Sequence, residues 1–272
     1  MTADDFGLAP EVNAAVELAH QQGILTAASL MVTGAAAADA VARAQRLQRL
    51  RVGLHLVLVD GNPALPPEKV PNLVGADGRL RLDLARLGLE ICARPSVRAQ
   101  LRAEIEAQFA AYQKTGLALD HVNAHKHFHL HPVVAREIIA IGPRYGMGAM
   151  RIPREPAAVL AKVETSAPSD PVYFAPWAKL LARRARRAGL RAPDWVFGLA
   201  WSGAMSAARV EGLLRNLPAG SSEIYLHPAT TDDFMDCARG YRYADELAAL
   251  TDPNVVALAR GAGMGLCGYC DL

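Results

Sequence analysis

The chain has 272 residues, 51% of them hydrophobic and 21% charged, which is enough for one large folded domain and excludes a disordered or fibrous protein. Its 29 Lys and Arg residues nearly balance its 27 Asp and Glu residues, so the charge gives no reason to expect a nucleic-acid partner. No apolar run approaches a membrane span, no secretory signal is visible, and four cysteines are too few for a disulfide scaffold, so we expect a cytoplasmic protein.

Helical and extended patterns alternate along the chain. We expect strands over Thr26–Thr33, Val52–Val59, Leu119–Asn123, Ala149–Ile152, Glu223–Leu226 and Met264–Tyr269. We expect helices over Pro10–Gln22, Ala35–Leu50, Pro95–Lys114, Pro132–Tyr145, Pro176–Ala188, Val210–Leu214 and Asp245–Ala259. This alternation is typical of a parallel β/α barrel or a doubly wound sheet, and the expected seven or eight strands favour the barrel.

Two segments interrupt the alternation. Residues 60–82 are rich in Pro and Gly and form a long connection, and such long loops inside a domain are usually functional. Residues 153–201 are irregular and contain one basic helical piece. Because nothing resembles a linker, we expect one domain over residues 1–272.

Histidine is concentrated in one place. Five of the eight histidines fall within residues 121–131, at His121, His125, His127, His129 and His131. Imidazole is the commonest metal ligand and the commonest acid or base near neutral pH. His125 lies just beyond the carboxyl end of an expected strand, where the active sites of barrels assemble.

Three further positions carry suitable side chains. Asp4 and Asp5 precede the first helix and could cap it, or one carboxylate could bind a metal while the other accepts a proton. His55 lies in an apolar strand, where a hydrogen-bonded core histidine is the simpler reading, and His227 follows another strand. Two histidines and an aspartate at one barrel mouth predict metal-assisted hydrolysis, and this donor set also suits zinc.

The helical piece from Pro176 is basic. Trp177, Leu180, Leu181 and Arg184 are expected to share one face, with Arg183, Arg186 and Arg187 on the other sides. A solvated helix is the simpler reading, and docking to an anionic membrane surface is the alternative.

Five motifs occur in a set order along the chain, and the sequence resembles the YdjC-like, or ChbG-type, carbohydrate deacetylases. The motifs are Thr2-Ala-Asp-Asp-Phe-Gly-Leu8, Thr26-Ala-Ala-Ser-Leu-Met-Val32, Val52-Gly-Leu-His-Leu56, His121-Val-Asn-Ala-His-Lys-His-Phe-His129 and His227-Pro228. The resemblance implies a distorted (β/α) TIM-like barrel that removes acetyl groups from N-acetylated sugars with one divalent metal, commonly magnesium.

The resemblance also implies roles for single residues. Asp4 matches the general base, and His227 matches the acid that protonates the leaving amine. The implied metal ligands are Asp5, His55 and His125. The residues expected to contact the sugar are His127, His129, Arg151 and Trp201.

The sequence departs from the family pattern at two places. Asn123 stands where most members carry Asp, and with the Trp201-Ser-Gly-Ala-Met205 segment this resembles the branch associated with hopanoid biosynthesis. That branch implies an N-acetylglucosaminyl lipid substrate met at the inner face of the membrane. Only Met1–Ala3 precede Asp4, so we expect either a start codon placed too late or a clipped first strand.

Other readings remain open at this point. The chain could be a sugar-binding barrel without turnover, a deacetylase of soluble chitooligosaccharides, or a phosphoester hydrolase, although the last predicts more carboxylate ligands. A homo-oligomer is compatible with the sequence.

Overall fold

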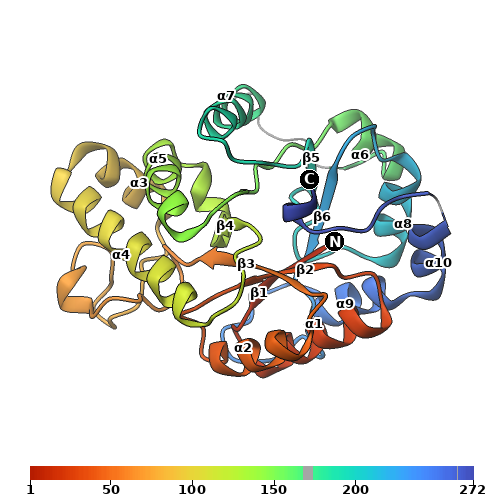
Figure 1. The fold of residues 1–272 in the computed structure, drawn as a ribbon, viewed down its shortest axis with the longest axis horizontal. Helices are drawn as coiled ribbons and strands as arrows, with labels where there is room; N and C mark the ends of the chain where they lie inside the picture. Colours follow the sequence, from red (N-terminus) through yellow and green to blue (C-terminus); the bar gives the residue numbers. More distant parts are fainter. Residues whose placement is uncertain (168–173, 262) are drawn as a thin grey trace.

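The computed structural model describes residues 1–167, 174–261 and 263–272 and is built around one curled parallel sheet (Figure 1). Its strands are β1 (Thr2–Phe6), β2 (Ala27–Leu30), β3 (Arg51–Leu56), β4 (Val122–Ala124), β5 (Trp195–Phe197) and β6 (Ser222–Leu226). The strand order is β4-β3-β2-β1-β6-β5, and every neighbouring pair is parallel. Near-continuous burial along the strands fits a parallel sheet covered by helices.

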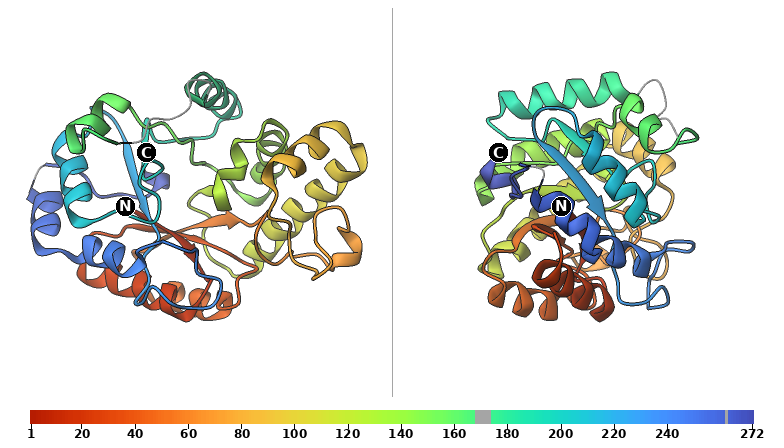
Figure 2. Two further views of the ribbon diagram at one scale, coloured as in Figure 1. Left: turned by 180° about the vertical axis from the view of Figure 1, so that it is seen from behind. Right: turned by 90° about the vertical axis from the view of Figure 1, so that its right-hand side faces the viewer.

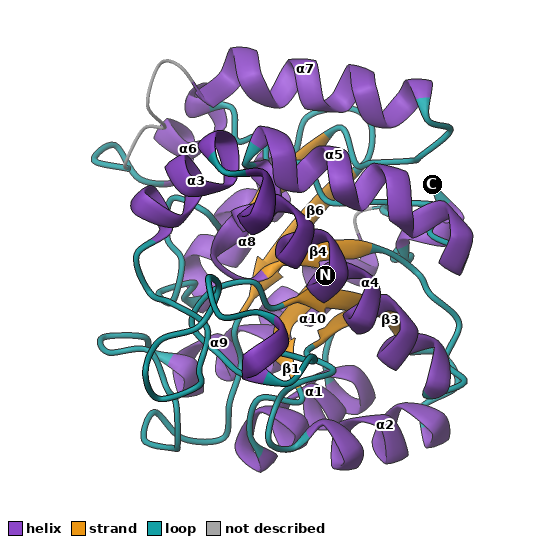
Figure 3. Ribbon diagram, turned by 90° about the vertical axis from the view of Figure 1, so that its left-hand side faces the viewer, coloured by secondary structure: helices purple, strands orange, loops and turns teal. Residues whose placement is uncertain are grey.

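Helices surround the sheet, as Figure 3 shows. They are α1 (Pro10–Gln22), α2 (Ala37–Arg46), α3 (Leu84–Ala93), α4 (Pro95–Lys114), α5 (Pro132–Ile141), α6 (Ala157–Val163), α7 (Phe174–Arg187), α8 (Ala207–Asn216), α9 (Tyr243–Thr251) and α10 (Pro253–Gly261). Short 3₁₀ helices cover Pro67–Lys69, His125–Leu130, Gly142–Tyr145 and Tyr269–Asp271. In Figure 1, α1, α2 and α9 lie below the sheet, α3 and α4 to the left, and α8 and α10 to the right.

Proline sets several helix boundaries. Pro10, Pro95 and Pro132 occupy the first position of α1, α4 and α5, where a missing N–H costs nothing. The single helix expected over Asp245–Ala259 is instead two helices, because Pro253 cannot donate the hydrogen bond that would continue α9.

The expected closed barrel is realised only as a curled half-barrel. Among the described residues, single bridges rather than a ladder join the two ends of the sheet: Val122 to Met150, Ala149 to Arg191, and Arg154 to Val196. The strand expected over Ala149–Ile152 is therefore reduced to isolated bridges. Pro153 follows it at once and has no N–H for a ladder. Figure 2 shows the sheet curling between the surrounding helices.

The first strand is present although only three residues precede Asp4. β1 covers Thr2–Phe6, and Asp4 and Asp5 are themselves strand residues. Thr2 pairs with Ala27 of β2 on one side and with Tyr225 of β6 on the other, so β1 is central in the sheet. The strand runs through the Asp pair instead of ending before it.

The last expected strand, Met264–Tyr269, is also wrong. In the described part of this segment the chain is irregular and ends in the 3₁₀ turn Tyr269–Asp271. The backbone N–H groups of Tyr269 and Cys270 donate to the side chain of Asp120 rather than to a neighbouring strand. Within residues 153–201 the structure adds α6 and β5, which the sequence pattern missed, and residues 168–173 of that segment lie outside the described residues.

Candidate active site

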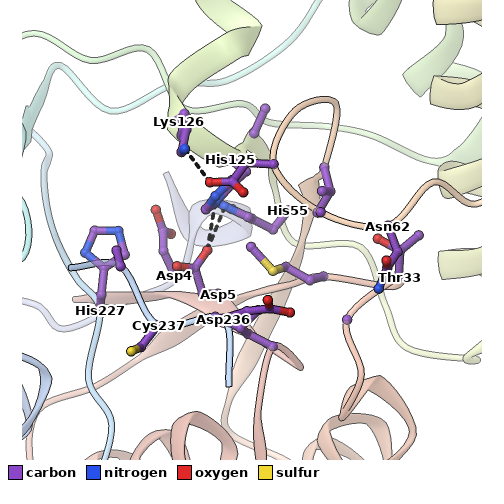
Figure 4. Close-up of a pocket in the computed structure, with 18 of the residues that line it drawn as sticks. Asp4, Asp5, Thr33, His55, Asn62, His125, Lys126, His227, Asp236 and Cys237 are labelled. Atoms are coloured by element: carbon purple, nitrogen blue, oxygen red, sulfur yellow. Dashed lines mark hydrogen bonds and ion pairs between the residues drawn. The ribbon is translucent and has the colours of Figure 1, made fainter. Parts of the chain in front are cut away.

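The predicted functional side chains gather at the carboxyl ends of the strands. Asp4 and Asp5 lie on β1, His55 lies near the end of β3, His125 directly follows β4, and His227 directly follows β6. In parallel sheets these strand ends form the mouth where ligands bind. Figure 4 shows His227 on one side of the Asp pair and His55 and His125 on the other.

An irregularity in β1 lets both carboxylates face the same cavity. Neighbouring residues of a regular strand point to opposite faces of the sheet. Here the register with β2 shifts between Ala3 and Phe6, and Asp5 has a φ of 61°, in the left-handed region. A non-glycine residue in this conformation is strained, and such strain is characteristic of functional sites.

Asp5, His55 and His125 form a group that could hold a metal ion. Their candidate ligand atoms lie within 4.8 Å of one another. Asp5 Oδ1 is 3.2 Å from His55 Nε2 and 3.1 Å from His125 Nδ1. Burial alone would raise the pKa of Asp5, but the two histidines hold it well below its ordinary value, so the carboxylate is ionised.

The hydrogen bonding of His55 leaves one nitrogen available as a ligand. His55 Nδ1 donates to Asn123 Oδ1 at 2.7 Å, which places the lone pair of the neutral ring on Nε2. His55 Nε2 is buried and lies 3.2 Å from Asp5 Oδ1, but it makes no hydrogen bond among the described residues. A histidine that binds a metal through one ring nitrogen usually donates a hydrogen bond from the other, and His55 has this arrangement beside the Asp5 carboxylate. The residues present therefore fit a divalent metal.

Asp4 is anchored differently from Asp5. Its Oδ2 accepts from Arg151 Nη1 at 2.5 Å, and its Oδ1 accepts from Arg151 Nη2 at 2.9 Å and from Asn123 Nδ2 at 3.1 Å. Burial alone would raise the pKa of Asp4, but the charge of Arg151 and then that of His55 hold it well below its ordinary value. The carboxylate is thus ionised and fixed in orientation, and Oδ2 keeps a lone pair free.

The turn after β4 places His125, Lys126 and His127 at the cavity. Lys126 and His127 follow His125 with φ values of 52° and 53°, two successive left-handed residues. His127 Nε2 lies 2.8 Å from the Tyr225 hydroxyl, and burial together with Arg151 lowers the pKa of His127 to about 3, so its ring is neutral. Lys126 pairs with Asp60 of the loop after β3.

His227 is supported by a buried acid. Its Nδ1 lies 3.8 Å from Glu246 Oε2, and its backbone N–H donates to the same carboxylate. Glu246 is fully buried on α9, and burial raises its pKa. The ring of His227 also packs edge-on against Tyr225 and Tyr241, with centroids 5.7 Å and 5.2 Å apart.

These groups open into one cavity of about 620 Å³, large enough for a sugar. Residues of the expected long loop at 60–82 and residues within 236–241 line this cavity. An ion pair of 3.2 Å between Arg79 Nη2 and Asp236 Oδ1 joins the two segments at the rim.

The comparisons with known proteins agree with this geometry. The family model of YdjC-like proteins matches residues 1–260. The chain belongs to the YdjC-like family. It is 31% identical to a carbohydrate deacetylase of Mus musculus over 297 residues, covering 100% of this chain and 94% of that protein. It is 30% identical to a carbohydrate deacetylase of Geobacillus stearothermophilus, covering 99% of this chain and 95% of that protein.

A solved structure shares the fold of this YdjC-like chain. An Enterococcus faecalis V583 protein named for cellobiose-phosphate cleavage superimposes with a TM-score of 0.77 at 24% identity, covering 99% of this chain and 96% of that chain. Among the described residues, no helix is both long and apolar enough to cross a membrane.

The residues expected to contact sugar are placed unevenly in the YdjC-like fold. His127 lines the cavity. The described residues that line it do not include His129, Arg151 or Trp201. Arg151 is fully buried and donates hydrogen bonds to Asp4 and Glu223. It therefore orients Asp4 without lining the cavity itself. His129 is fully buried as well.

Sequence reasoning missed two supporting residues. Glu246 carries no local signal, because it lies inside an ordinary helical pattern 19 residues after His227. Asn123 was noted only as a departure from the family pattern, yet its amide bridges His55 and Asp4.

Proposed function

We propose that this protein is a metal-dependent carbohydrate deacetylase that hydrolyses the acetamide of an N-acetylglucosamine-type sugar. The observation that carries the proposal is the pairing of two carboxylates with different environments. Asp5 lies among histidine ligands, whereas Asp4 is held beside it by Arg151 and is free of the metal group. The enzyme class is that of relatives that match the whole chain.

The Asp5, His55 and His125 group would hold the metal, which supplies a Lewis acid for the acetamide carbonyl when bound. Two imidazoles and one carboxylate suit zinc by donor type, whereas the family resemblance implies magnesium. Measuring which metal copurifies, and which restores activity after chelation, decides between them.

Asp4 is suited to accept the proton of the attacking water. Its carboxylate is ionised, and Arg151 and Asn123 hold its oxygens without occupying every lone pair. The leaving nitrogen must also be protonated before the C–N bond breaks.

His227 is suited to deliver that proton to the nitrogen. It lines the cavity on the opposite side of the Asp pair from the metal group (Figure 4). Glu246 accepts from the backbone N–H of His227 and lies 3.8 Å from its Nδ1, which holds this residue at the cavity. The overall reaction adds one water across the C–N bond and yields acetate and the free amino sugar.

The finer substrate assignment is an N-acetylglucosaminyl lipid, such as a hopanoid glycolipid, met at an anionic membrane surface. The support is α7, whose outer face exposes Lys179, Arg183, Arg184, Arg186 and Arg187. The apolar face expected on this helix divides in the structure, because Leu181 is fully buried whereas Leu180 is 40% exposed. Docking would therefore rest on charge, at about 1 kcal/mol per basic residue.

Acetate release tests the function directly. Purified protein is incubated with an N-acetylglucosaminyl lipid and with chitooligosaccharides, and mass spectrometry follows the loss of one acetyl group from each. Loss from the lipid alone supports the glycolipid assignment, and loss from the soluble sugars alone replaces it. Sugar binding without acetate release from either class would show a binding barrel instead.

A further inference from the structure

The C-terminal turn lies at the end of the sheet opposite to the cavity. Gly268–Asp271 contacts Asp120, just before β4, and Glu223, near the start of β6. Both contacts lie at the amino ends of parallel strands, whereas the cavity lies at their carboxyl ends. Figures 1 and 2 place the two chain termini close together at this end.

This turn is tied to the core by a buried carboxylate. Asp120 accepts from the backbone N–H groups of Tyr269 at 3.1 Å and Cys270 at 3.0 Å. Burial alone would raise the pKa of Asp120, but the hydrogen bond from His121 and these N–H groups lower it to about 2. The ring of Tyr269 stacks on His121 with centroids 4.3 Å apart. The turn is therefore a fixed part of the core.

One buried chain of contacts runs from Tyr269 to Asp4. The Tyr269 hydroxyl donates to Glu223 Oε2. Glu223 accepts from Arg151 Nε at 3.0 Å and Nη2 at 2.7 Å, and Arg151 in turn holds both oxygens of Asp4. All four residues are at most 4% exposed. Arg151 thus lies between two carboxylates, and its orientation toward Asp4 depends on where Glu223 is held.

A second chain starts from the same turn. His121 Nδ1 lies 2.9 Å from Asp120 Oδ2, and its Nε2 lies 2.9 Å from the Ser29 hydroxyl. Asn123 Nδ2 donates to Ser29 Oγ at 2.9 Å and to Asp4 Oδ1 at 3.1 Å. The donors and acceptors fit one direction throughout, with the Ser29 hydroxyl donating to His121 and His121 donating to Asp120.

The sequence leaves room for this second chain. A Cβ on Gly53 would lie 2.5 Å from the ring of His121, so glycine is required where β3 passes that ring. This gives a role to His121, the first histidine of the motif, which lies outside the metal group.

We propose that Tyr269 is a positioning residue for Asp4, acting through Glu223 and Arg151. The inference rests on the proposed function, because it assigns Tyr269 to the orientation of the proposed proton acceptor. The Tyr269 hydroxyl occupies Glu223 Oε2 and so fixes that carboxylate against Arg151. Without the hydroxyl, Glu223 can turn, Arg151 follows it, and the two oxygens of Asp4 lose their fixed direction.

The test compares Tyr269→Phe with Tyr112→Phe. Both tyrosines are buried, and each hydroxyl donates within the core, but the Tyr112 hydroxyl donates to the backbone carbonyls of Val52 and Ala118 and has no link to Asp4. We expect Tyr269→Phe to lower kcat about tenfold, the lower end of what outer hydrogen-bond partners contribute, with KM and metal content unchanged. Tyr112→Phe should lower the melting temperature while kcat stays the same.

A double-mutant cycle checks the route. If the effect passes through Glu223, Tyr269→Phe lowers kcat in the wild-type background but adds little in the Glu223→Gln background. Independent effects would multiply instead. A kcat for Tyr269→Phe equal to that of active wild type, or fully multiplicative losses, would overturn the inference.

A second cycle needs no activity and separates this inference from the proposed function. Tyr269 and Asp4 do not touch, so their melting-temperature changes should add unless the buried chain couples them. Non-additive changes for Tyr269→Phe and Asp4→Asn support the coupling even if wild type releases no acetate, a result that would count against the proposed function alone. Additive changes would overturn the coupling.

Discussion

Replacing Asp4 by Asn separates its chemical role from its structural one. The substitution removes the negative charge, but the Asn oxygen can still accept from Arg151, and Glu223 still pairs with the guanidinium. No buried charge is left without a partner. The Asn NH2 replaces one of two accepting oxygens, so the expected cost is that of one lost hydrogen bond to a charged group, about 1.5–3 kcal/mol, or about 3–5 °C in Tm for a chain of this size.

Activity should fall far more than stability. A general base contributes about 10² to 10⁴ in rate, so Asp4→Asn should lower kcat at least about 10²-fold. Metal content should be unchanged, because Asp4 lies outside the Asp5, His55 and His125 group. Acetate release, bound metal and thermal unfolding are measured on the same preparation.

Arg151→Met provides the contrast. It leaves Asp4 and Glu223 as two buried carboxylates without their shared cation, which costs about 3–5 kcal/mol or more. We expect a larger loss of Tm than for Asp4→Asn. Wild-type turnover by Asp4→Asn, or loss of its metal, would refute the assignment of Asp4. A smaller Tm loss for Arg151→Met than for Asp4→Asn would refute the charge argument.

Three further predictions follow from the same contacts. His125→Ala should lower the bound metal and abolish the rise in Tm that added metal gives wild type, and an unchanged metal content would exclude His125 as a ligand. The pKa of Asp120 is about 2 in the folded protein, below its ordinary value of 3.8. Its contribution to stability is therefore complete above about pH 5 and is lost as the pH falls from there toward about 2. Asp120→Asn should therefore flatten the acid side of the urea-unfolding profile, and parallel profiles would contradict this. Arg183→Glu with Arg187→Glu should reduce co-sedimentation with anionic liposomes at low salt but not with neutral ones, and equal recovery for both proteins would remove the membrane proposal.

The parts of the site that lie on strand ends could be predicted from the sequence. His125 stands out among the five clustered histidines because it lies just beyond an expected strand, and the structure places it beside Asp5 and His55. A ligand at the end of a strand has a local signature: an apolar segment, then a polar residue. The helices beginning at Pro10, Pro95 and Pro132 were predicted for the same reason, since proline marks the first turn within the sequence itself.

The first strand could not be predicted correctly because its pattern is broken at the site. Both Asp4 and Asp5 face the cavity, which no regular strand allows, because Asp5 has a left-handed backbone conformation. The sequence therefore lacks the alternation of polar and apolar residues that would mark a strand here. When a functional residue departs from the regular pattern of its strand or helix, the sequence pattern that would identify that strand or helix is lost. The same holds for the turn at Lys126 and His127.

Arg151 shows why the supporting residues stay hidden. Its partner Asp4 is 147 positions away and Glu223 is 72 positions away, so nothing near Arg151 in the sequence marks it as part of a buried network. An arginine inside the short apolar run Ala149–Ile152 reads as a surface or sugar-binding residue, because unpaired arginines are rarely buried. Only the folding of β1 and β6 side by side supplies the two carboxylates that make its burial favourable. A candidate ligand such as His125 can therefore be read from local pattern, whereas residues that orient the proposed catalytic groups become visible only once strands distant in sequence have paired.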